Sequence, residues 1–98
     1  MQKKTLFEPG DLVRSFTGDF GLVISRQTFG RIKETVSRGR RPGHFFAAGC
    51  ADIVDYLLQV PVFFEDGTYD IMKAMNIKTV KEDQKQRRQK LEETLRNL

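Results

Sequence analysis

Apolar and polar residues alternate most clearly between residues 54 and 65. The apolar residues on the even positions of this stretch are Val54, Tyr56, Leu58, Val60, Val62 and Phe64. Alternation with a period of two predicts a half-buried β-strand, and the length of the stretch predicts a bend or a break. Pro61 falls on the polar positions, where it indicates a bulge or an edge strand. A helix over residues 50–58 is the alternative, but the β-branched and aromatic residues favour a strand.

Turn-forming residues divide the rest of the β-rich sequence. Thr17, Gly18 and Asp19 predict a hairpin turn, because Gly and Asp tolerate the positive φ angles of tight turns. Asp66 and Gly67 predict a second hairpin. The strands expected from these patterns are 11–16, 21–26, about 54–65, 68–73 and 76–80. Five strands suffice to close a small barrel, which would remove the exposed edges of a sheet.

A C-terminal α-helix is expected at about 80–97, because no Gly or Pro interrupts this part of the chain. Thr79 and Glu82 match the capping box with which many helices begin. The apolar residues Leu91, Leu95 and Leu98 share one face of this helix. Either the barrel or a neighbouring subunit must cover that face.

Residues 27–52 form a basic insertion between two strand regions, at about 11–26 and 53–80. Phe29, Ile32 and Val36 recur with helical spacing. This spacing predicts a short amphipathic helix between residues 28 and 39, and an irregular loop is the equal alternative. The pattern alone does not choose between them.

The length of 98 residues fits one domain, 1–98, with one modest core. Hydrophobic residues make up 39% of the chain, which is typical of a folded domain rather than a disordered one. The chain has no run of about 18 apolar residues, and its first ten residues lack the apolar core of a signal peptide. We therefore expect a cytoplasmic protein that does not enter a membrane. Cys50 is the only cysteine, which excludes an internal disulfide and predicts a buried, inert thiol.

Positive charge is concentrated in the insertion. The whole chain has a formal net charge of +4. Six basic residues and one acidic residue between Arg26 and His44 give that segment alone a net charge of about +5. A local basic patch of this kind is typical of an electrostatic binding surface for nucleic acid.

The arginines of the stretch 38-RGRRPGHFF-46 are the main candidates for phosphate binding. Guanidinium groups match phosphate oxygens, and the release of condensed counterions favours association. The alternative is a solvated loop kept soluble by its charge. The predicted nucleic-acid-binding residues are Arg31, Lys33, Arg38, Arg40, Arg41, His44 and Phe45.

Phenylalanine side chains beside positive charge are candidates for stacking on unpaired bases. Most of the eight phenylalanines are needed in the core of so small a domain. The best stacking candidates are Phe45, beside the arginines, and Phe20, next to a turn.

The sequence shows no catalytic or metal-binding pattern. His44 is the only histidine and has no acid, base or further ligand at a suggestive spacing. Asp66 is explained by its turn, and Asp52, Asp55 and Asp70 by solvent-facing positions on strands. The sequence contains no P-loop and no dinucleotide-binding fingerprint. We therefore expect a protein that is not an enzyme and that uses no cofactor and no metal.

The stretches 10-GDLVRSFTGDFGLVI-24 and 62-VFFEDGTYDIMKAMNIKTV-80 resemble the small β-barrels of the Sm-like and Src-homology-three kind, in particular Sm-like proteins of marine-phage type. This resemblance implies a five-stranded barrel, a homo-oligomer that forms a closed ring, and an RNA partner bound near the centre of that ring. It assigns no RNA-contact residue here, because no Arg-Gly pair follows the fourth expected strand.

The sequence therefore predicts a mainly β barrel with a basic insertion and a C-terminal helix. Its expected function is non-enzymatic binding of RNA or single-stranded DNA, as a homo-oligomer, through contacts to the phosphate backbone. A phage-encoded protein of this kind would act in the host cytoplasm. The alternative is a protein-interaction or phage structural adaptor, in which the barrel and the leucines Leu91, Leu95 and Leu98 bind another protein.

Overall fold

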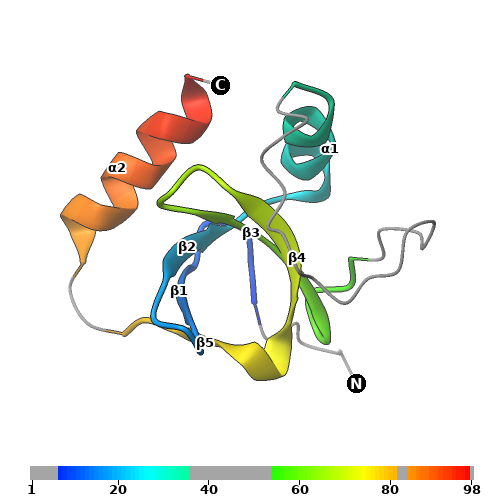
Figure 1. The fold of residues 1–98 in the computed structure, drawn as a ribbon, viewed down its shortest axis with the longest axis vertical. Helices are drawn as coiled ribbons and strands as arrows, with labels where there is room; N and C mark the ends of the chain where they lie inside the picture. Colours follow the sequence, from blue (N-terminus) through cyan, green and yellow to red (C-terminus); the bar gives the residue numbers. More distant parts are fainter. Residues whose placement is uncertain (1–6, 36–53, 82–83, 98) are drawn as a thin grey trace.

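The computed structural model describes residues 7–35, 54–81 and 84–97, and its five strands form one antiparallel sheet (Figure 1). The order of strands across the sheet is β4-β3-β2-β1-β5. The elements are β1 (Leu12–Ser15), β2 (Phe20–Val23), α1 (Arg26–Thr35), β3 (Gln59–Phe64), β4 (Tyr69–Lys73), the 3-10 helix η1 (Ala74–Asn76), β5 (Ile77–Thr79) and α2 (Lys85–Arg96). The predicted mainly β fold with a C-terminal helix is confirmed at this level.

Both predicted hairpin turns are confirmed. Gly18 has φ +91° and Gly67 has φ +88°, in the left-handed region that glycine adopts without strain. In the second turn, the Asp66 carboxylate accepts a hydrogen bond from the Thr68 amide at 2.9 Å. Local residue chemistry therefore determines where β1 turns into β2 and where β3 turns into β4.

The bend or break predicted in the stretch 54–65 is confirmed, but the part before the bend is not a strand, because β3 begins only at Gln59. The chain bends at Tyr56, which has φ +58°. Asp55 holds this bend with one carboxylate oxygen, which accepts hydrogen bonds from the amides of residues 57, 58 and 59 at 2.8–2.9 Å. The apolar alternation therefore continues through a segment that is not a strand.

Pro61 lies inside the sheet, because β3 pairs with β2 on one side and with β4 on the other. The Pro61 carbonyl accepts a hydrogen bond from the Ile24 amide at 3.0 Å, just after the end of β2. In an antiparallel strand the N–H and C=O of one residue point to the same neighbour. The missing N–H of Pro61 therefore costs β3 no hydrogen bond to β4, and the predicted edge or bulge position is wrong.

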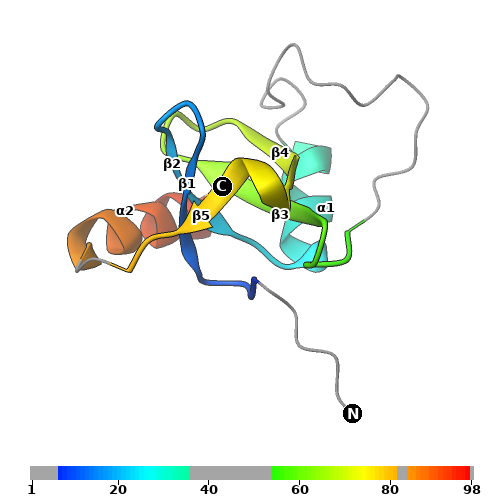
Figure 2. The ribbon, with the colours of Figure 1, turned by 90° about the horizontal axis from the view of Figure 1, so that it is seen from below.

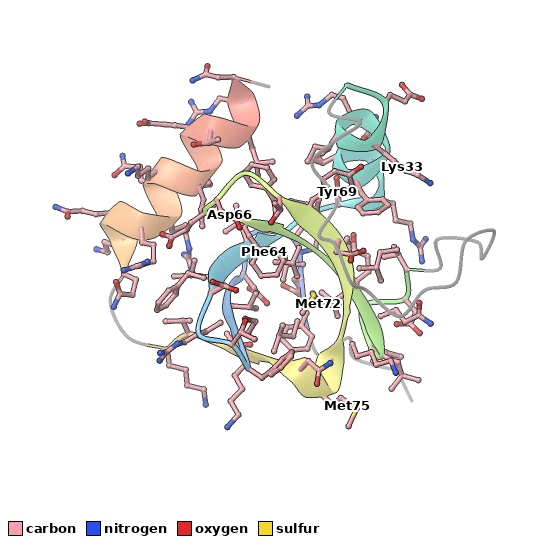
Figure 3. The ribbon with its side chains drawn as sticks, in the orientation of Figure 1. Lys33, Phe64, Asp66, Tyr69, Met72 and Met75 are labelled. Carbon is pink, nitrogen blue, oxygen red and sulfur yellow. The ribbon has the colours of Figure 1, made fainter. Side chains whose placement is uncertain are left out.

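The middle of the sheet is buried on both faces, and its apolar side chains divide between two clusters, whereas Arg14 of β1 and Lys78 and Thr79 of β5 are exposed. The inner cluster consists of Phe7, Val13, Val23, Val60, Val62, Phe64, Met72 and Ile77. The outer cluster consists of Leu12, Leu22, Ile24, Phe29, Ile32, Val54, Phe63, Tyr69, Ile71, Leu91 and Leu95. Figure 3 shows Phe64 and Met72 inside the curve of the sheet and Tyr69 toward α1. The half-buried strand predicted at β3 is therefore wrong, because β3 is buried on both faces from Val60 to Phe64.

Both helices lie on the outside of the curved sheet, as Figures 1 and 2 show. Helix α1 confirms the helical interpretation of the insertion for residues up to Thr35, and Ser25 caps it by accepting a hydrogen bond from the Thr28 amide at 3.0 Å. Leu91 and Leu95 of α2 are buried in the outer cluster, so the sheet of the same chain covers them.

The predicted start of the C-terminal helix is wrong. Thr79 belongs to β5, and α2 begins only at Lys85, after the N-cap residue Gln84, whose side chain makes no capping hydrogen bond. Backbone pairing of residues 77–79 with β1 explains the difference, because it holds the proposed capping residue in extended conformation. None of the helices in the described ranges is long and apolar enough to cross a membrane.

Candidate nucleic-acid interface

The central part of the predicted site lies outside the described residues. Arg38, Arg40, Arg41, His44 and Phe45 all fall within residues 36–53, as do Cys50 and Asp52, and Leu98 also lies outside the described ranges. The predictions that concern these residues stay predictions.

Arg31 and Lys33 are exposed on α1. The Arg31 guanidinium donates a hydrogen bond to the Leu95 carbonyl of α2 at 3.4 Å, so it links the two helices. Figure 3 shows Lys33 on α1 and Met75 on η1 at opposite ends of the molecule. Neither of these two predicted residues lines the groove that is described next.

A shallow groove follows the outer surface of β1 and β5. It consists of two adjoining hollows of about 340 and 320 Å³ that share Arg14 and Lys78. We call it the β1–β5 groove. Its principal side chains are Arg14, Phe16, Phe20, Met75, Lys78 and Lys81.

Exposed apolar side chains mark one end of this groove. Phe16 is 75% exposed and Met75 is 85% exposed. The Phe16 amide donates a hydrogen bond to the Asn76 carbonyl at 2.9 Å, which ties the end of β1 to η1. An exposed phenylalanine and an exposed methionine that line the same hollow form a flat apolar surface open to solvent.

Two cations face each other in the middle of the groove. Arg14 on β1 lies directly opposite Lys78 on β5 in the strand register. Like charges in opposite positions of an antiparallel pair destabilise a sheet. Within residues 7–35, 54–81 and 84–97, neither side chain forms an ion pair. The strand register therefore places two positive charges opposite each other without an acidic partner in the described part of the chain.

Phe20 marks the other end of the groove and also borders a neighbouring hollow. Lys81 and Val80 lie with Phe20 in the basic hollow. The neighbouring hollow, of about 480 Å³, is lined by the acidic residues Asp19, Glu65 and Asp66 together with Arg87. The Phe20 ring therefore borders both a basic hollow and a hollow of mixed charge.

Two side chains in the bend before β3, Asp55 and Tyr56, have shifted pKa values. Hydrogen bonds from the backbone amides of Gln59, Leu57 and Leu58 lower the pKa of the Asp55 carboxylate. Burial raises the pKa of Tyr56, whose hydroxyl donates a hydrogen bond to the Ile24 carbonyl at 2.8 Å. Both groups are explained by their structural role in the bend.

The aspartates predicted on solvent-facing strand positions are placed differently. Asp55 lies in the bend before β3, and Asp70 is fully buried in β4. Asp70 lies opposite Val62 in the register, so it faces the inner side of the sheet, where one of its oxygens accepts a hydrogen bond from the Ile71 amide at 2.8 Å. The prediction for these two residues is therefore wrong, because strand parity alone does not show that both faces of β4 are covered.

Sequence reasoning missed the groove as a unit. Arg14 and Phe16 come from β1, whereas Met75 and Lys78 come from the segment that follows β4. The preference for Phe20 over Phe16 followed from its place beside a turn, but Phe16 is the more exposed ring. The sequence contains both cations, Arg14 and Lys78, but only the β1–β5 register shows that they lie opposite each other.

The chain matches no protein-family model, no curated protein and no solved structure. The geometry of the described residues is therefore the basis for the functional proposal.

Proposed function

We propose that this protein binds single-stranded RNA or DNA along the β1–β5 groove and catalyses no reaction. The observation that carries the proposal is the exposed Phe16 ring beside the opposed cations Arg14 and Lys78. Proteins that bind single strands combine a positively charged groove with aromatic rings on which bases stack.

The apolar side chains of the groove would contact bases, and its cations would contact phosphates. The ring of Phe16 and the Met75 side chain offer an apolar surface to the face of a base. Arg14, Lys78 and Lys81 lie within reach of the phosphates that link successive bases. Binding of this type reads no base edge, so we expect little sequence preference and an affinity that falls steeply with salt.

The basic insertion belongs to the same proposal. Arg38, Arg40 and Arg41 add positive charge to the chain, and together with the groove they supply the electrostatic attraction for a polyanion. Lys33 on α1 lies away from Met75 of the groove (Figure 3), and Arg31 is bonded to the Leu95 carbonyl of α2, so both would contribute through their field rather than through direct contact with the same nucleotides.

We include in the proposal a closed barrel of the Sm-like and Src-homology-three kind. The two outer strands of the sheet, β4 and β5, are joined by the three residues of η1, and this short connection supports a strongly curved sheet. Unpaired backbone groups on outer strands also favour pairing with another copy, which supports a homo-oligomer. The proposed place of action is the cytoplasm, that of the host if a phage encodes the protein.

The test is a fluorescence-anisotropy titration of labelled single-stranded RNA and DNA at two salt concentrations. Phe16→Ala should weaken binding by about 1–3 kcal/mol, the range for one stacked base. The double variant Arg14→Ala with Lys78→Ala should also lower the salt dependence, by about one released counterion for each charge. Light scattering on the same samples gives the mass of the oligomer.

Matched controls separate the groove from general effects. Leu58→Ala removes an exposed apolar side chain that does not line the groove. Lys90→Ala with Arg96→Ala removes two exposed charges of α2 that also lie outside it. If these controls weaken binding as much as the groove variants do, or if wild-type protein does not bind at low salt, the proposal is wrong.

A protein-interaction adaptor is the second candidate. The three large apolar side chains exposed among the described residues are Phe16, Leu58 and Met75. All three lie at η1. Met75 belongs to it, the Phe16 amide donates a hydrogen bond to the Asn76 carbonyl, and the Leu58 carbonyl accepts one from the Ala74 amide at 2.9 Å. An adaptor would use this apolar surface, and Leu58→Ala would then impair partner binding as strongly as Phe16→Ala.

A further inference from the structure

The ring of Phe20 already has an occupant in the free protein. The central guanidinium carbon of Arg87, from α2, lies 3.9 Å from the centre of the ring. The corresponding carbon of Arg14 lies 5.4 Å from it. A planar cation at 3.9 Å takes the position that a stacked base would occupy.

The contacts that hold Arg87 over the ring are weak ones. Its Nη1 atom donates a hydrogen bond to Glu65 at 2.6 Å, but the two side chains remain 36% and 37% exposed, and an exposed ion pair contributes little. The Nε atom of Arg87 is buried without a hydrogen-bond partner among the described residues. Arg87 is therefore incompletely satisfied in this position.

Phe20 lies on the path of a strand bound in the β1–β5 groove. It is directly opposite Arg14 in the β1–β2 register, and Arg14 is in turn opposite Lys78. Phe16 and Phe20 thus lie at the two ends of a groove whose middle carries the paired cations. A strand with one base on Phe16 and its phosphates at Arg14 and Lys78 would bring a following base to Phe20.

We propose that Phe20 is a second base-stacking position and that Arg87 occupies it until an unpaired base displaces the guanidinium. This inference rests on the proposed function, since it extends the same bound strand. On displacement, Arg87 leaves Glu65 and the ring, and a phosphate of the strand becomes its stronger, charge-assisted partner. The ligand class is an unpaired segment of nucleic acid, because bases paired in a duplex offer no free face to two separate rings.

The experiment compares Arg87→Ala with Arg88→Ala, which removes the same charge from the neighbouring, exposed position of α2. Binding of a fluorescein-labelled oligouridylate of about 10 nucleotides, a length that one small domain covers, is measured by anisotropy. Arg87→Ala should bind at least roughly fivefold more tightly than Arg88→Ala, the lower end of what one stacked base contributes. Adding Phe20→Leu to Arg87→Ala should abolish this gain.

A second pair of variants, Arg87→Lys and Arg88→Lys, keeps the positive charge and so tests whether lost charge alone causes the effect. Arg87→Lys lacks the planar guanidinium and should also bind more tightly than Arg88→Lys. Circular dichroism verifies that each variant is folded. Equal or weaker binding by both Arg87 variants, relative to their Arg88 counterparts, overturns the inference.

The failure of this inference differs from the failure of the proposed function. If wild-type protein binds and Phe16→Ala weakens binding, the groove stands, whatever Arg87 does. If wild-type protein does not bind the oligouridylate at low salt, both proposals fall together. A gain in Arg87→Ala that persists after Phe20→Leu would also overturn the second stacking position, because the ring would then play no part in it.

Discussion

The two ends of the outer face of the sheet differ in what covers them. Leu12 and Phe16 lie on the same face of the chain segment that forms β1, yet Leu12 is buried under the helices and Phe16 is 75% exposed beside η1. The helices α1 and α2 cover the region around β2, β3 and β4, and of the β1–β5 groove α2 reaches the Phe20 end, where Arg87 lies over the ring. Apolar residues on one face of a sheet thus serve either the core or a binding surface, and the position of the helices decides which.

The largest expected difference between the two regions is in the loss of stability when one phenylalanine of each is replaced by alanine. Phe63 is buried in the outer cluster, so Phe63→Ala should destabilise the protein by about 3–5 kcal/mol. Phe16→Ala should change stability by no more than about 0.5 kcal/mol, as for other exposed positions. Urea unfolding followed by circular dichroism measures both. Similar losses in the two variants would show that Phe16 is part of the core.

Two glycines, one in the packed sheet and one on the surface of α1, should respond in opposite ways to replacement by alanine. A Cβ atom on Gly21 of β2 would lie 2.5 Å from the Val62 side chain and 3.0 Å from the Phe63 carbonyl oxygen. Gly21→Ala should therefore destabilise the protein by about 1–3 kcal/mol, as overpacked cores do.

Gly30 is the matched control, because nothing lies within 4 Å of a Cβ atom there. Gly30→Ala should stabilise the protein by about 0.5–1 kcal/mol, since alanine is the better helix former. The same unfolding experiment measures both variants. A stabilising Gly21→Ala would contradict the close approach of β2 and β3.

The smallest expected effect concerns pH and the bend before β3. Amide hydrogen bonds lower the pKa of Asp55 in the folded state, so the ionised carboxylate favours folding. This contribution is present above the unfolded pKa of about 3.9 and is lost as the pH falls through the lower folded value. The stability difference between wild type and Asp55→Asn should therefore be largest near neutral pH and shrink in acid.

Urea midpoints at neutral and strongly acidic pH measure this difference. Glu93→Gln, an exposed change of the same charge on α2, controls for the altered net charge. A difference between wild type and Asp55→Asn that stays constant over the whole pH range would show that the carboxylate charge has no role in the bend.

The elements that sequence predicted well depend on neighbouring residues. The turns at Gly18 and Gly67 follow from the φ angles that glycine permits. Strands β1, β4 and β5 fall within their predicted ranges, because alternation and β-propensity act over a few residues. The predicted start of the C-terminal helix failed because pairing with the distant strand β1 holds residues 77–79 in extended conformation. The predicted start of the third strand failed because the Asp55 side chain binds the amides of residues 57–59 and bends the chain, although apolar residues still alternate there.

The candidate site was less predictable than the fold. Arg14 and Lys78 are far apart in the chain and become neighbours only through the β1–β5 register. The contact between Arg87 and Phe20 joins α2 to β2, and no local pattern connects these two residues. The basic residues at 38–41 were identified from their density in the sequence, and their role as phosphate ligands stays a prediction.

Four properties could be predicted from the sequence alone: the mainly β class, the hairpin turns, the presence of a C-terminal helix and the positive charge of the chain. These properties depend on local conformational preference and on composition, which are independent of how the elements pack. Tertiary structure alone decided that α2 packs Leu91 and Leu95 onto the sheet of its own chain and leaves Phe16 and Met75 open to solvent. Burial is a property of the three-dimensional packing of segments that are distant in the chain, so an apolar residue becomes core or binding surface only when the fold is complete.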